Sequence, residues 1–239
     1  MSHSFAFARR EWTEAAELLS ARYRTVALDM PGFGEAADDT DGLSIELMCR
    51  RVADTIRELE LTRYVLVGHS MTGKVMQILA GHAGKDLGLS EPPEKTVLIT
   101  PTPLGTEVGG TEFRRELREM PLDRADAEAF VDARVATPIT DEQRRRTVED
   151  FLATSRTAWE WWLDSGTYED WVERAAPVET EALVVVADLD PTWGLEMQTE
   201  LTLPHLAHHR VVTVACGHSV PLEAPRRLAE LITEFVEQG

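Results

Sequence analysis

The chain has 239 residues and carries a formal net charge of −18 at pH 7. Because a DNA- or RNA-binding face needs clustered lysine and arginine, this charge argues against a nucleic-acid partner. The two cysteines, Cys49 and Cys216, give no disulfide framework and fit a reducing compartment. We see neither a leader-like opening nor an apolar run of the ~18 residues that span a membrane, so we expect a cytoplasmic protein without a membrane partner.

The pattern of apolar residues predicts strands and helices that alternate along the chain. Buried strands are expected at 25–28, 64–67, 95–100, 182–187 and 210–214. Helical spacing is expected over 13–23, 44–59, 71–83 and, at the end of the chain, about 223–236. This alternation is typical of an α/β fold, a mostly parallel sheet with helices on both faces.

The pattern of residues changes between 104 and 176, where the sequence is charge-rich, has helical spacing and contains no strand-like run. We therefore predict a helical cap at 104–176, inserted into an α/β core made of 1–103 and 177–239. The cap sequence ends in a cluster of aromatic residues. Most of these should pack between cap helices, but we expect Trp159 and Trp162 to line an apolar substrate pocket.

The stretch Gly68-His69-Ser70-Met71-Thr72 lies between a predicted buried strand and a predicted helix. A serine on such a turn has an accessible hydroxyl, and the N-terminus of the following helix directs N–H groups toward any negative charge beside it. The stretch matches the nucleophile pattern G-x-S-x-G except at Thr72, where a β-branched residue predicts a slightly wider turn. The alternative for Ser70 is a serine in an ordinary tight turn.

Two later loops carry residues that could activate this serine. Asp188 and Asp190 follow the strand at 182–187, and His218 follows the strand at 210–214. Because the carboxyl ends of parallel strands meet at one edge of a sheet, we expect these side chains near Ser70. A serine needs a base to remove its proton, and the base needs an anion to orient it.

Together with the segments 29–34 and 217–225, these motifs make the sequence resemble an α/β-hydrolase from His3 to the C-terminus. The resemblance implies that Ser70 is the nucleophile and His218 the general base. It implies that Asp190 is the orienting acid, in preference to Asp188, because the family's acid usually ends a four-residue G-x-x-D stretch.

The resemblance also implies two N–H donors for the oxyanion of the transition state. One is the amide of Met71, directly after the nucleophile. The other follows a His-Gly pair in the family, and His3-Ser4-Phe5 occupies that place here, so Phe5 is the candidate. Losing one such donor typically costs ~10²–10³ in rate.

We thus expect a serine hydrolase that cleaves a small apolar ester or lactone through an acyl-enzyme, with no cofactor and no metal. His205, His208 and His209 have a spacing that could hold a metal, but a solvated surface is the favoured interpretation. Since His218 must be neutral to act as a base, activity should rise through roughly pH 6–7. The expected partner is a small ester-like molecule, and the protein is expected to be a monomer or homodimer.

Two alternatives stay open. Within the resembled family, perhydrolases (cofactor-free haloperoxidases), enol-lactonases and cyanohydrin lyases share the fold and the triad. Outside enzymology, the chain could be a non-catalytic α/β-hydrolase-like protein that binds a ligand or partner under the cap. The shortened N-terminus and Thr72 favour this second alternative, whereas the complete triad speaks against it.

The start of the chain departs from the resembled family, which has strands before the position of His3, whereas Met1 and Ser2 alone precede it here. The third strand of that family would lie between 25–28 and 64–67. Either those two strands pair directly, or another segment fills the gap, or the chain lacks its true beginning. We favour a mis-set start or a truncation, and from this start we expect low stability and a loose oxyanion loop.

Overall fold

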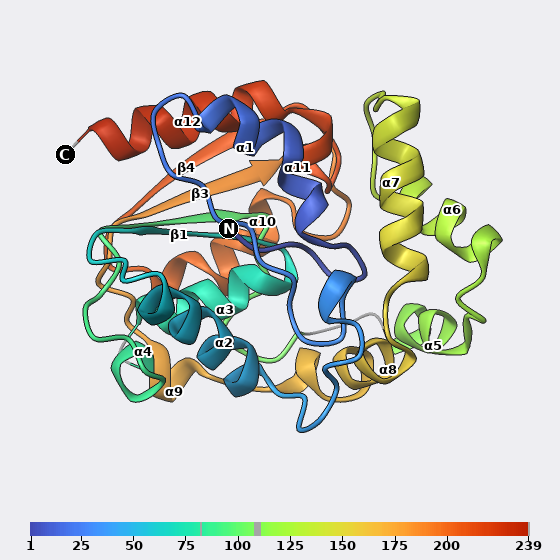
Figure 1. Ribbon diagram of the computed structural model, residues 1–239, viewed down its shortest axis with the longest axis horizontal. Coiled ribbons are helices and arrows are strands. Elements are labelled where there is room, and N and C mark those ends of the chain that lie inside the picture. Colours follow the sequence, from blue (N-terminus) through green and yellow to red (C-terminus); the bar gives the residue numbers. More distant parts are fainter. Residues whose placement is uncertain (82, 108–110, 239) are drawn as a thin grey trace.

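The computed structural model, which describes residues 1–81, 83–107 and 111–238, contains a parallel sheet between two layers of helices (Figure 1). Its four strands are β1 (Val65–His69), β2 (Lys95–Ile99), β3 (Ala182–Ala187) and β4 (His209–Val214). They lie in the order β1-β2-β3-β4, and every neighbouring pair is parallel. The predicted fold, an α/β fold with a mostly parallel sheet and helices on both faces, is confirmed.

Each strand sends alternate side chains to opposite faces of the sheet, as the two-residue period of a strand requires. Val67 and Val185 pack in one buried cluster with α1 (Thr13–Leu19) and α12 (Pro225–Glu237). Leu66, Leu98 and Val184 pack in the other cluster with α2 (Ile45–Glu58) and α3 (Met71–Ala80). The sheet is therefore apolar on both faces, which explains why its strands appear as continuous apolar runs in the sequence.

Several short helices complete the two layers. They are α4 (Ala83–Asp86), α10 (Leu195–Leu201) and α11 (Val220–Glu223), with the 3-10 helices η1 (Arg9–Trp12), η2 (Gly34–Ala36) and η4 (Leu203–His205). Figure 1 shows α11 and α12 beside α1 above the sheet, and α2 and α3 below it.

The first residues of the chain lie in the sheet beside β1. Ser2 N–H donates to Val67 O at 3.0 Å, and His69 N–H donates to Ser2 O at 3.3 Å. On the other side Leu28 N–H donates to Met1 O at 3.0 Å. Of the three arrangements considered for the gap between 25–28 and β1, the structure has the second, in which another segment fills it.

The predicted buried strand at 25–28 is wrong in this structure. These four residues are half-buried, and they join the sheet through an isolated bridge between Ser2 and Leu28. A ladder needs several consecutive bridges, and Ser2 and Leu28 form a single one.

Helices follow one another between β2 and β3. They are α5 (Thr111–Glu119), α6 (Arg124–Asp132), α7 (Asp141–Leu152), α8 (Arg156–Asp164), η3 (Gly166–Tyr168) and α9 (Val172–Ala175). Capping boxes begin α6 at Asp123 and α7 at Thr140, where side chain and backbone satisfy each other's donors. In Figure 1, α5 to α8 group together at the end of the sheet. The division into core and cap at residues 104 and 176 stays a prediction.

A lysine of α3 joins this inserted segment to the core. The Lys74 ammonium donates to Gly105 O at 3.0 Å and to Glu169 O at 2.6 Å. Its side chain is fully buried, and burial lowers the pKa of Lys74 to about 8. Both ends of the insert are thereby hydrogen-bonded to the helix that follows Ser70.

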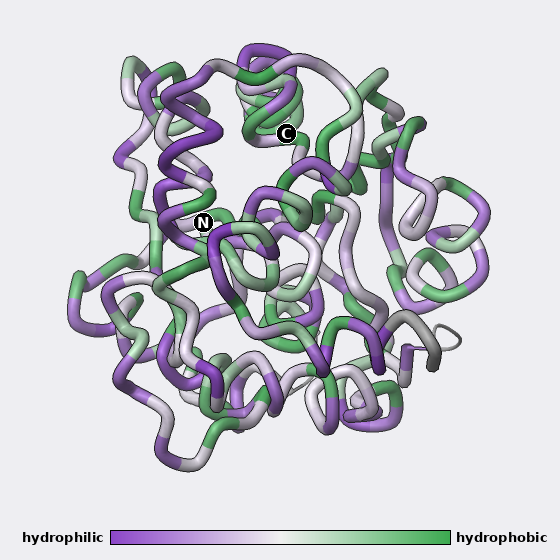
Figure 2. The backbone as a smooth tube through the Cα atoms, turned by 90° about the vertical axis from the view of Figure 1, so that its right-hand side faces the viewer, coloured by the Kyte–Doolittle hydropathy of each residue, from purple (hydrophilic) through white to green (hydrophobic). Residues whose placement is uncertain are grey.

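Hydrophilic and hydrophobic stretches are interspersed along the backbone (Figure 2). Among the described residues, no helix combines the length and the apolar character that crossing a lipid bilayer requires.

The loop at 29–34 contacts α8 at Gly32, which has φ +87°. A Cβ built on Gly32 would lie 2.2 Å from Ala158 Cβ, and Gly32 O accepts a hydrogen bond from Ser155 N–H at 2.9 Å. Glycine is therefore needed at this position both for its backbone conformation and for space.

We expect Gly32→Ala to lower the free energy of unfolding by about 1–3 kcal/mol, because the methyl group overpacks the contact with α8. Gly42→Ala is the matched control, since Gly42 also has a positive φ, +69°, but its Cβ would meet no atom within 4 Å. Urea unfolding of both variants separates backbone strain from the clash. Equal losses in the two variants would contradict a steric contact at Gly32.

Candidate active site

Ser70 lies at the sharp turn between β1 and α3, with φ 51° and ψ −113°. Residues other than glycine rarely adopt these backbone angles, so the surrounding structure must maintain this conformation of Ser70. Glycines on either side allow it, because a Cβ on Gly68 would lie 2.6 Å from Thr72 O and a Cβ on Gly73 would lie 2.5 Å from Pro101 Cβ. The turn has the strand-to-helix context that the sequence predicted for a nucleophile.

Thr72, which replaces the last glycine of the motif, is completely buried. Its hydroxyl lies 2.9 Å from Ser2 O and accepts a hydrogen bond from His69 N–H at 3.1 Å. The threonine thus binds the turn to the N-terminal segment.

His218 and Asp190 meet at the carboxyl ends of β4 and β3. His218 Nδ1 lies 2.6 Å from Asp190 Oδ2, and the other oxygen, Oδ1, accepts N–H bonds from Thr192 at 2.9 Å and Trp193 at 3.1 Å. Asp188, the alternative considered from the sequence, is exposed, whereas Asp190 is buried. The structure therefore joins His218 to the aspartate that the resemblance favoured.

The protonation of this pair follows from its contacts. Burial alone would raise the pKa of Asp190, but the adjacent His218 and the two N–H donors lower that pKa to about 2. Burial lowers the pKa of His218, and Asp190 offsets part of this effect. At neutral pH an ionised carboxylate thus faces a neutral imidazole whose proton is on Nδ1, and Nε2 is free to accept a proton.

A cavity of about 380 Å³ adjoins this pair. Ser70, Asp190 and His218 all line it, together with Ser4 and Phe5 from the N-terminal segment. Ser70 Oγ makes no hydrogen bond to His218 among the described residues. All three predicted residues border one cavity, where His218 and Asp190 are hydrogen-bonded to each other.

The two predicted oxyanion donors are available. In the described part of the chain, neither Met71 N–H nor Phe5 N–H donates to a protein acceptor. Met71 is the first residue of α3, where backbone N–H groups have no partner within the helix.

A family model described as "Alpha/beta hydrolase family" matches residues 1–231. The chain belongs to the alpha/beta hydrolase family. It is 23% identical over 256 residues to a protein of Bacillus subtilis (strain 168) with the provisional name 2-succinyl-6-hydroxy-2,4-cyclohexadiene-1-carboxylate synthase, over 98% of this chain and 88% of that protein.

Solved structures show the same fold. An esterase from Exiguobacterium antarcticum superposes with a TM-score of 0.85 at 18% identity, over 100% of this chain and 91% of that one. A bromoperoxidase from Bacillus anthracis superposes with a TM-score of 0.86 at 17% identity, over 99% of this chain and 90% of that one. The family match supports a hydrolase.

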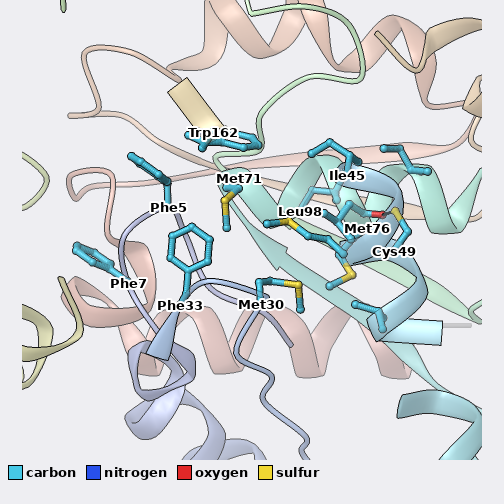
Figure 3. Close-up of a cluster of buried hydrophobic side chains, with 14 of the residues drawn as sticks. Phe5, Phe7, Met30, Phe33, Ile45, Cys49, Met71, Met76, Leu98 and Trp162 are labelled. Carbon is cyan, nitrogen blue, oxygen red and sulfur yellow. Dashed lines mark hydrogen bonds between the residues drawn. The ribbon is translucent and has the colours of Figure 1, made fainter. Parts of the chain in front are cut away.

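In this alpha/beta hydrolase the two candidate tryptophans differ in position. Trp162 lines the cavity. Trp159 does not; it is completely buried in the core, where its Nε1–H donates to Leu117 O at 2.9 Å. Its ring stacks on Phe5 with centroids 4.8 Å apart, so Trp159 supports the cavity wall from behind. Figure 3 shows Phe5 and Trp162 in the same apolar cluster as Met71.

Glu11 is a central residue of the site that the sequence analysis missed. Its carboxylate is buried and accepts hydrogen bonds from Ser4 N–H at 3.0 Å and Ser4 Oγ at 3.1 Å. His69 Nδ1 lies 2.8 Å from the same carboxylate, and His69 Nε2 donates to His218 O at 2.9 Å. One carboxylate thus connects the N-terminal loop to the turn at Ser70 and, through His69, to His218.

His3, at the start of the N-terminal loop, is held in one neutral form. Met30 N–H donates to its Nε2 at 3.0 Å, so the proton is on Nδ1, which lies 2.7 Å from Ser4 O. Burial lowers the pKa of His3 accordingly. The loop that carries Phe5 is therefore fixed by two buried side chains, contrary to the expected loose oxyanion loop.

The sequence analysis also missed three charged residues that line the cavity. Glu107, Arg114 and Arg134 all line the cavity. They lie in the charge-rich sequence between β2 and β3, where most charges face solvent, so no local pattern distinguishes them.

The histidines at 205, 208 and 209 form no site with metal-binding geometry. Among the described residues, no group of three or more potential ligands lies close enough to hold a metal ion.

We expect Glu11→Gln to lower the free energy of unfolding by about 1.5–3 kcal/mol, the range for hydrogen bonds to charged groups. Urea unfolding at pH 7 measures the loss, and Glu17→Gln, an exposed residue of α1, removes the same charge as a control. The contacts with His69 and Ser4 lower the pKa of Glu11 against the effect of burial. The stabilisation is therefore present above the unfolded value of 4.5 and should fade as the pH falls below it. Equal losses in the two variants at pH 7 would contradict this role of Glu11.

Proposed function

We propose that the protein is a serine hydrolase that cleaves a small carboxylic ester or lactone through an acyl-enzyme. The observation that carries the proposal is the hydrogen bond between His218 Nδ1 and Asp190 Oδ2, beside a cavity that Ser70 also lines. Family membership supports a hydrolase, and the esterase among the structural neighbours is consistent with ester chemistry.

In the first step, His218 Nε2 takes the proton of Ser70 Oγ while Oγ attacks the ester carbonyl carbon. The carbonyl oxygen becomes an oxyanion, for which Met71 N–H and Phe5 N–H are the proposed donors. His218, now an imidazolium beside the Asp190 carboxylate, gives its proton to the leaving alcohol oxygen as the carbon–oxygen bond breaks. The acyl group remains on Ser70.

In the second step, water attacks the acyl carbon and His218 takes its proton. The second tetrahedral intermediate collapses, the bond to Ser70 Oγ breaks, and the proton returns from His218 to that oxygen. The carboxylic acid leaves, and the starting state is restored. Asp190 keeps its negative charge throughout and orients the imidazole.

The bromoperoxidase among the structural neighbours favours a second reaction at the same acyl-enzyme. If hydrogen peroxide rather than water accepted the acyl group, the product would be a peracid. The steps and the residues are otherwise identical, so the two activities differ in the acceptor that reaches the acyl carbon.

A fluorophosphonate probe tests for the activated serine. We expect the wild-type protein to be labelled and Ser70→Ala not to be, because the probe reacts with a serine whose proton is removed by a neighbouring base. Ser20→Ala, at an exposed position after α1, should be labelled like the wild type. No labelling of the folded wild-type protein would favour the non-catalytic ligand-binding alternative.

The pH dependence of kcat/KM tests the role of His218. Because burial lowers the pKa of His218, the imidazole loses its proton below the ordinary histidine value of 6.5. Activity requires the neutral form, so it should rise with pH and reach half its maximum below pH 6.5. This refines the pH 6–7 range expected from an unperturbed histidine. His208→Gln, an exposed control, should leave the midpoint unchanged, whereas a wild-type midpoint above 6.5 would contradict the assignment.

A further inference from the structure

Two arginines line the cavity, and their surroundings differ. Arg114 Nη2 lies 3.3 Å from Glu107 Oε2 and donates to the carbonyl oxygen of the same residue at 3.1 Å. Burial raises the pKa of Glu107, whereas Arg114 and Lys74 act to lower it. The charge of Arg114 thus has a counter-ion inside the protein.

Arg134 has no such counter-ion. Its guanidinium carbon lies 3.3 Å from the centroid of the Phe130 ring, and its Nη1 donates a long hydrogen bond of 3.4 Å to Phe130 O. Among the described residues, no carboxylate lies within ion-pairing distance of this guanidinium. Several of its five N–H donors are therefore left for another acceptor.

The position of Arg134 is fixed relative to the predicted catalytic residues. Its carbonyl oxygen accepts a hydrogen bond at 3.1 Å from the N–H of Ser219, the residue after His218. The charge of Arg134 acts on His218, whose pKa it lowers, and the Asp190 carboxylate acts on Arg134 in turn. The arginine therefore lies at the same end of the cavity as the imidazole.

A partly buried cation without a carboxylate in hydrogen-bonding contact is costly, because it has lost part of its hydration. Burial lowers the pKa of Arg134 to about 9, which still leaves the side chain charged at neutral pH. A carboxylate would restore charge-assisted hydrogen bonds, and the planar guanidinium matches its two oxygens. The remaining wall is largely apolar, with Phe5, Leu117, Trp162, Leu163 and Met197, and it suits the carbon chain that would carry such a group.

We propose that Arg134 binds a carboxylate of the substrate, so that the preferred substrate is an ester or lactone that also carries an ionised carboxyl group. The ester part of this inference rests on the proposed function, whereas the anion site rests on the surroundings of Arg134. The net charge of −18 repels anions at long range, so selection of an anionic substrate requires a local cation of this kind.

Matched esters test the proposal. Nitrophenyl half-esters of glutaric, adipic and pimelic acid end in a carboxylate, and their terminal amides have nearly the same shape without the charge. Acetyl esters of hydroxybenzoic acid and hydroxybenzamide place the same difference on the alcohol side. In at least one series, we expect the wild type to prefer the carboxylate by about 10- to 100-fold in kcat/KM, the range for a hydrogen-bonded charge pair.

The decisive variant is Arg134→Gln, with Arg134→Lys as the charge-conserving variant. Arg134→Gln should abolish the preference for the carboxylate, measured as the ratio of kcat/KM for the carboxylate ester to kcat/KM for the amide. Any effect of the lost charge on His218 acts on both esters and cancels in this ratio. Arg134→Lys should keep part of the preference. Arg227→Gln, on the exposed side of α12, removes the same charge and should behave as the wild type.

Arg134 has one competing role, which is to adjust the electrostatics of His218 and Asp190. In that case Arg134→Gln would change the rate and the pH midpoint equally for the carboxylate and amide esters, and the proposal would be overturned. A wild type without any preference would also overturn it. In both of these cases, labelling of the wild-type protein by the fluorophosphonate probe would show that the anion-site proposal has failed while the proposed hydrolase function still holds.

Binding to an inactive protein tests the anion site independently of turnover. Calorimetry with Ser70→Ala and monomethyl adipate should detect binding that weakens at least tenfold in the double variant Ser70→Ala, Arg134→Gln. The terminal amide of the same ester should bind both proteins equally. If no ester is cleaved and no probe reacts, the proposed hydrolase function is wrong. This binding experiment still shows whether Arg134 forms an anion site. The proposed anion site would be overturned if Ser70→Ala did not bind monomethyl adipate, or if the double variant bound it equally well.

Discussion

The parallel register of the sheet is the constraint on which the rest of the structure depends. Because β1, β3 and β4 run in the same direction, the residues that follow them come together at one edge. Ser70 follows β1, Asp190 follows β3 and His218 follows β4, so three residues far apart in the sequence border one cavity. The insert between β2 and β3 contributes part of the remaining wall, including Arg114, Arg134 and Trp162.

Much of this arrangement could be predicted from the sequence, because strand ends are visible there. Apolar runs locate the strands, and a serine, an aspartate and a histidine directly after them predict the residues that meet. The strand ends predict in this way that His218 meets an aspartate after β3, and the structure shows that contact as a hydrogen bond to Asp190. The preference for Asp190 over Asp188 came from the family resemblance, and the structure supports it through burial and that same hydrogen bond.

The remaining features depend on contacts that no local pattern encodes. Residues 25–28 have the composition of a buried strand, but whether they form a ladder depends on a pairing segment elsewhere in the chain. Glu11 looks like any acidic residue near a helix start, and its burial results from the approach of His69 and Ser4. Trp159 and Trp162 are equivalent in sequence, and helix α8 directs one to the core and the other to the cavity.

Lys74 makes the inserted segment dependent on the core helix α3 rather than an interchangeable module. Its ammonium is hydrogen-bonded to backbone carbonyl groups near both ends of the insert, at Gly105 and Glu169, and it belongs to the helix that begins after Ser70. Carbonyl groups are present in any sequence, but their positions depend on loop length and path. A chimaera that exchanges this insert between relatives therefore has to reproduce the two loop conformations, or it leaves a buried ammonium unsatisfied in the helix that follows Ser70.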